Sequence, residues 1–113
     1  MDKLVENAVL KFTKTVKESE IYKRYRYQLD KIKENPELYS QVNEFRRLNF
    51  ELQNTTQVDE LFDKMDAFEK EYEKFRENPI VDDFLRAELA FCRLIQEINT
   101  YITEELDFDL YAM

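Results

Sequence analysis

Residues 79–106 read PIVDDFLRAELAFCRLIQEINTYITEEL. Apolar side chains recur there at spacings of three and four residues, from Val81 through Phe84 and Phe91 to Ile98 and Ile102, which is typical of an α-helix. At about 100° per residue, the apolar side chains cover more than half of the helix circumference. A helix this apolar is predicted to lie at the centre of a bundle or to pack against a second copy of the chain.

The remaining chain shows the same helical pattern in four shorter segments. The first runs from about Lys3 to Lys17, and the second carries Ile21, Tyr25, Leu29 and Ile32 on one stripe. Whether these two form one bent helix or two stays open. The third segment runs from Pro36 to about Gln53, and the fourth has its apolar face between Val58 and Phe75.

Two dipeptides mark helix starts, Asn35-Pro36 and Asn78-Pro79. Asparagine favours the capping position, and proline favours the first helical position because the missing N–H would have no partner there. A weaker start is Thr56-Gln57-Val58-Asp59, which resembles a capping box with aspartate in place of glutamate.

Composition supports a helical fold, because the 113 residues contain no glycine and only two prolines. Tight hairpin turns usually need glycine, so a sheet is disfavoured. We expect an all-α fold: a bundle of four to five long amphipathic helices in one domain spanning residues 1–113 that self-associates. The tail, residues 106–113, is expected to be frayed or docked on a partner.

The charge is acidic and uneven. Residues 1–33 carry nine basic and five acidic side chains, whereas residues 34–113 carry eight basic and twenty acidic ones. The net charge of −8 argues against a general nucleic-acid coat protein. No signal peptide or membrane span is recognisable, and the lone Cys92 cannot form an internal disulfide, so we expect a cytoplasmic protein.

The side chains of common enzyme chemistries are missing. Histidine is absent, which removes the usual general base and metal ligand, and without glycine no phosphate-binding loop can form. One cysteine cannot hold zinc or an iron–sulfur cluster, and we expect Cys92 to be a small core side chain. The acidic groups Asp59, Asp63 and Asp66, and Glu69 with Glu73, are expected to form a solvated surface. We therefore predict no catalytic residues, no cofactor and no metal.

A basic-aromatic run, Tyr22-Lys23-Arg24-Tyr25-Arg26-Tyr27, is a candidate binding surface. Tyr27 projects away from the apolar stripe, with Lys23 and Lys31 one turn to either side. Such a face can bind an acidic protein, or a nucleic acid by phosphate contact and base stacking. Alternatively, it is an ordinary solvated helix face.

Five further side chains stand out from the helical projection. Glu88 falls inside the apolar arc of the last helix, where a buried carboxylate would need a partner; otherwise it lies at the edge of the arc and reaches water. Tyr39 and Phe50 project off the main stripe of the third helix, and Phe91 and Leu94 belong to the wide arc of the last. These four are candidates for self-association.

The order of these motifs over about residues 4–104 resembles the YlbF/YmcA family of small helical bacterial proteins. The resemblance rests on Glu18-Ser19-Glu20-Ile21-Tyr22-Lys23-Arg24-Tyr25, then Asn35-Pro36-Glu37-Leu38 and Glu44-Phe45-Arg46. It continues through Asn78-Pro79-Ile80-Val81 and Phe84-Leu85 to Ala87-Glu88-Leu89.

The resemblance implies an all-helical fold, self-association and a non-enzymatic role in competence, sporulation or biofilm regulation. Some members act in complexes that steer the membrane-associated endoribonuclease Y in mRNA processing, and some carry cysteine-ligated iron–sulfur clusters. Because this chain has only Cys92, cluster binding is not expected of it. We predict a regulatory adaptor whose partners are a second copy and other regulatory proteins, including an RNase-associated complex. The alternative is a nucleic-acid-associated factor.

Overall fold

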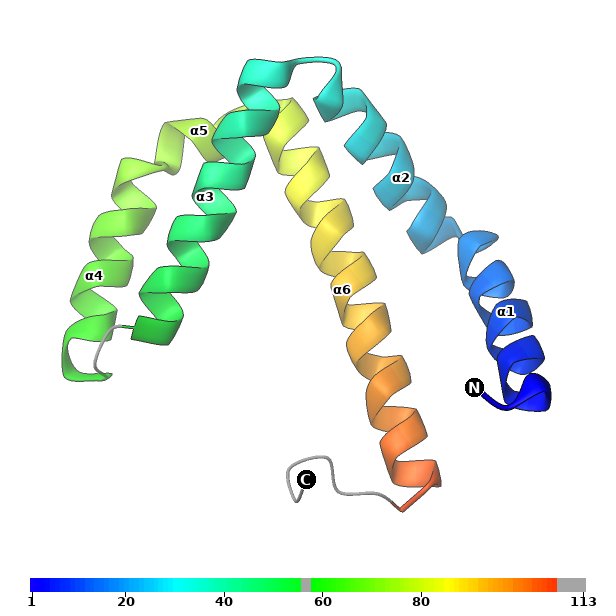
Figure 1. Ribbon diagram of the computed structural model, residues 1–113. Coiled ribbons are helices and arrows are strands. Elements are labelled where there is room, and N and C mark those ends of the chain that lie inside the picture. The colour runs from blue at the N-terminus through cyan, green and yellow to red at the C-terminus, as the bar shows by residue number, and fades with distance from the viewer. Residues whose placement is uncertain (56–57, 108–113) are drawn as a thin grey trace. The chain divides into compact units, whose positions relative to one another are not determined.

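The protein is all-helical in a computed structural model that describes residues 1–55 and 58–107 (Figure 1). These two ranges contain no β-strand. Their helices are α1 (Lys3–Lys17), α2 (Glu20–Lys33), α3 (Pro36–Thr55), α4 (Val58–Glu71), α5 (Glu73–Glu77) and α6 (Pro79–Glu105). None of the helices in the described ranges is long and apolar enough to cross a membrane.

Ser19 separates the first two helices, which answers the question that the sequence leaves open. Its Oγ accepts a hydrogen bond from the backbone N–H of Tyr22 at 3.2 Å and donates one to the carbonyl of Val16 at 2.6 Å. The same side chain thus terminates α1 and caps α2. At the start of α1, Asp2 Oδ1 accepts from the N–H groups of Leu4 and Val5.

The two Asn-Pro helix starts are confirmed. Asn35 Oδ1 accepts from the N–H of Leu38 at 3.1 Å, and Asn78 Oδ1 accepts from the N–H of Ile80 at 2.9 Å. Each asparagine therefore satisfies one backbone donor that the first helical turn leaves without a partner. The proposed capping box at Thr56-Gln57 lies outside the described residues.

We expect Asn35→Ala to lower the free energy of unfolding by about 1 kcal/mol, because alanine offers no acceptor to the first turn of α3. Urea denaturation measures this loss. Asn35→Asp is the matched control, since its carboxylate can cap the same N–H and it should retain most of the stability. Equal losses in the two variants would contradict the capping role.

The described chain divides into two compact units. The middle unit spans Gln28–Leu85, and the terminal unit combines Met1–Tyr27 with the segment from Arg86 onward. Helices α2 and α6 contribute to both units.

The middle unit holds most of the buried apolar side chains. They come from the end of α2, from α3 and from the start of α6: Leu29, Ile32, Leu38, Val42, Phe45, Val81 and Phe84. Ile32, Val42, Val81 and Phe84 are fully buried. Helices α3 and α4 lie side by side in this unit (Figure 1). The core therefore joins two consecutive helices, α2 and α3, to the start of α6, which is far from them in the sequence.

Aromatic rings join α3 to α4 and α5 in the middle unit. The ring of Phe45 lies 5.3 Å from those of Phe68 and Tyr72 and 5.8 Å from that of Phe75. The Arg76 guanidinium lies 6.0 Å from the centre of the Phe45 ring. Offset and edge-on ring pairs at these distances are stabilising.

The predicted fourth helix is interrupted at Tyr72, so the described residues form six helices where the sequence predicts four to five. Tyr72 leaves helical geometry (φ −101°, ψ 8°), and α5 begins at the next residue. Its ring contacts Phe68 before the break and Phe75 after it, at 4.8 and 5.9 Å. An apolar spacing that continues across one irregular residue cannot reveal such a break from the sequence.

The terminal unit has few buried side chains. The ring of Phe91 stacks on Tyr25 at 5.1 Å and meets Tyr22 edge-on at 5.5 Å. Helix α1 buries none of its residues, and its apolar side chains are exposed, with Leu4 81% and Phe12 45% accessible. The tail is described only to Leu106 and Asp107, which are exposed, and residues 108–113 lie outside the described part.

Candidate functional site

The described residues contain no group of three or more histidine, cysteine, aspartate or glutamate side chains arranged to hold a metal ion. Asp63, Asp66, Glu69 and Glu73 are all exposed, and the side chain of Asp59 lies outside the described ones. The described acidic side chains of α4 and α5 thus face solvent, as the sequence predicts.

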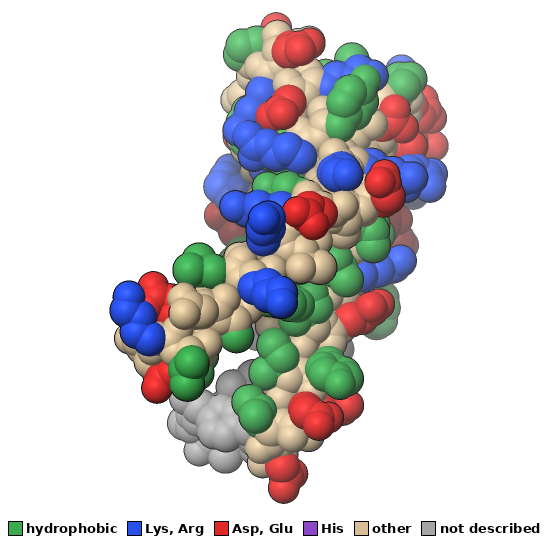
Figure 2. All heavy atoms as spheres, turned by 90° about the vertical axis from the view of Figure 1, so that its right-hand side faces the viewer, with side chains coloured by type: hydrophobic (Ala, Val, Ile, Leu, Met, Phe, Trp, Pro, Cys, Tyr) green, Lys and Arg blue, Asp and Glu red, His purple; other side chains and the backbone are tan. Residues whose placement is uncertain are grey.

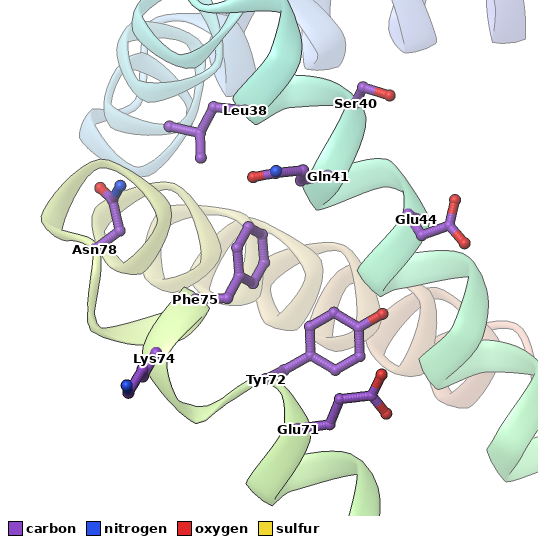
Figure 3. Close-up of a pocket in the computed structure, with 9 residues that line it drawn as sticks. All are labelled: Leu38, Ser40, Gln41, Glu44, Glu71, Tyr72, Lys74, Phe75 and Asn78. Atoms are coloured by element: carbon purple, nitrogen blue, oxygen red, sulfur yellow. The ribbon is translucent and has the colours of Figure 1, made fainter.

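A cleft lies in the middle unit between α3 and the α4–α5 break, with a volume of about 610 Å³ (Figure 3). The rings of Tyr72 and Phe75 point toward α3, whereas the Glu44 carboxylate points away from them. Burial, followed by the charges of Glu71 and Glu44, raises the pKa of Tyr72 above 10.0. The Tyr72 phenol is therefore a weaker acid than a tyrosine in water.

Glu44 also forms an ion pair with Arg47 on α3. Arg47 donates hydrogen bonds to Glu44 at 3.0 Å and to Glu51 at 2.8 Å, and these bonds raise the pKa of Arg47. All three side chains are exposed, so the contacts contribute little stability. We assign the cleft no catalytic role, because Glu44, one of the residues that line it, is held by Arg47.

The basic-aromatic face of α2 is exposed. The Tyr27 side chain is 63% accessible, and Lys23 and Lys31 are exposed at i−4 and i+4 on the same helix. The Lys23 ammonium lies 4.0 Å from the Glu20 carboxylate, with both side chains largely in water. These three residues are therefore available to a partner.

The other residues singled out in the sequence have different surroundings. Phe50 is 66% exposed, whereas Tyr39 is half-buried with the Lys33 ammonium 5.7 Å from its ring centre. Phe91 is half-buried in its stack with Tyr25, and Leu94 is half-buried. Glu88 is also half-buried, so its carboxylate is not sealed in a core.

The expectation that Cys92 belongs to a core is wrong, since the thiol is exposed. The apolar arc of α6 is wider than the surface that neighbouring helices of the chain cover, so a residue of that arc can face solvent. Leu89 and Ile95 of the same arc are exposed for the same reason.

The sequence does not reveal an apolar groove of about 800 Å³ that lies between α1 and the C-terminal part of α6, both in the terminal unit. We call it the α1–α6 groove. From α1 it is lined by Leu4, Val5, Ala8, Val9 and Phe12. From α6 it is lined by Leu94, Glu97, Ile98, Tyr101 and Ile102. Figure 2 faces the side that carries α1 and shows hydrophobic side chains at the surface among charged ones.

Helical periodicity identifies the apolar stripe of α1, but it assigns the stripe to a core. Periodicity shows that a face prefers an apolar neighbour, not which molecule supplies that neighbour. Leu94, chosen from the sequence as a self-association candidate, is one of the ten lining residues.

Comparison with known proteins places the sequence in a family. The sequence model described as "Control of competence regulator ComK, YlbF/YmcA" matches residues 5–107. A UPF0342 protein of Caldicellulosiruptor bescii is 25% identical over 95 residues, which cover 82% of this chain and 80% of that protein. No solved structure matches the chain.

Proposed function

Because the chain belongs to the YlbF/YmcA family, we propose that it is a regulatory adaptor that works by binding other proteins and catalyses no reaction. The family is described by its control of a competence regulator, which supports a regulatory role. The absence of histidine and glycine from the sequence supports a mechanism without catalysis.

The partner surface that we propose is the α2 face formed by Lys23, Tyr27 and Lys31. The observation that carries the proposal is Tyr27, whose ring is 63% exposed between two exposed lysines. A tyrosine in this position stabilises the fold little, because most of its ring stays in water. Tyrosine and basic side chains at an exposed helix face fit an acidic protein surface.

The partners that we propose are a second copy of the chain and other regulatory proteins, including an RNase-associated complex of the kind that the family resemblance implies. We place the protein in the cytoplasm. A homodimer accords with the large apolar side chains that stay exposed on α1 and α6.

A second candidate is a nucleic-acid-associated factor that uses the same face. It is favoured by the excess of basic residues in positions 1–33, nine against five, in a chain of net charge −8. Lysines can contact phosphates while Tyr27 stacks on an exposed base.

Affinity purification of the tagged protein from its native host separates the two candidates, since it recovers proteins and RNA together. The adaptor function predicts specific protein partners that remain after ribonuclease treatment. Recovery of RNA that survives moderate salt, with no protein partner, would favour the second candidate and contradict the first.

A further inference from the structure

We draw no further inference here: the strongest candidate, the apolar α1–α6 groove of the terminal unit, carries nothing beyond the proposed function, because nothing in the described part of the chain shows what covers it.

Discussion

Phe84→Ala should lower the free energy of unfolding by about 3–5 kcal/mol, the largest loss that we expect from a single substitution in this chain. The Phe84 side chain is fully buried in the middle unit, and the Arg46 guanidinium lies 5.5 Å from its ring centre. Alanine would leave a cavity beside buried side chains of α2, α3 and α6, and it would remove the ring face that Arg46 covers. A loss of this size is a large part of the 5–15 kcal/mol that typically stabilises a small domain.

Urea denaturation followed by circular dichroism measures the loss, with the wild type in the same buffer. The control is Phe62→Ala, the same chemical change at a ring that is 74% exposed, where we expect a change within about 0.5 kcal/mol. Similar losses in the two variants would contradict the assignment of Phe84 to the core.

The triple variant Lys23→Glu, Tyr27→Ala, Lys31→Glu should weaken partner binding by about 2 kcal/mol or more, roughly 30-fold, without destabilising the fold. The ring of Tyr27 is mostly in water, so its loss should change the free energy of unfolding by at most about 0.5 kcal/mol. Reversal of two lysine charges adds repulsion of an acidic partner surface. Partner capture and thermal unfolding are measured on the same preparations.

A matched control is available on α4. The triple variant Phe62→Ala, Lys64→Glu, Lys70→Glu makes the same change in charge and also removes an exposed ring. It should capture partners normally. Loss of RNA with retention of protein partners in the α2 variant would favour the nucleic-acid function, and unchanged capture of both would show that the α2 face is only solvated surface. A large drop in melting temperature would mean that Tyr27 supports the fold.

The helices and their starts could be predicted because they depend on local chemistry. Asn35 and Asn78 cap the helices that their prolines begin, and the apolar spacing of α3 selects the buried Leu38, Val42 and Phe45. Capping and periodicity act within one or two turns of helix, so a single sequence contains the whole signal.

The surroundings of each helix could not be predicted in the same way. The apolar stripe of α1 and the apolar arc of α6 both have the periodicity of core faces, yet the stripe of α1 is exposed and so is Cys92 within the arc of α6. Burial depends on which helices pack against each other, and helical periodicity does not predict those contacts. The α1–α6 groove could therefore be found only in the structure. The sequence did indicate surplus apolar surface, through Leu94 and the unusually wide apolar arc of α6.

The exposure of α1 also has a consequence for how stability is distributed along the chain. Segments with few buried contacts open locally at a small fraction of the free energy needed for global unfolding. Phe84, Val42 and Ile32 anchor the middle unit, but α1 has no buried side chain to resist such opening. Only the ordered form of α1 can bind a molecule that covers its apolar stripe. Binding therefore shifts the equilibrium between the ordered and the opened helix toward the ordered form by mass action. We therefore expect the ordered fraction of α1 to rise with the concentration of the molecule that binds its apolar stripe. The middle unit stays folded at every concentration of that molecule.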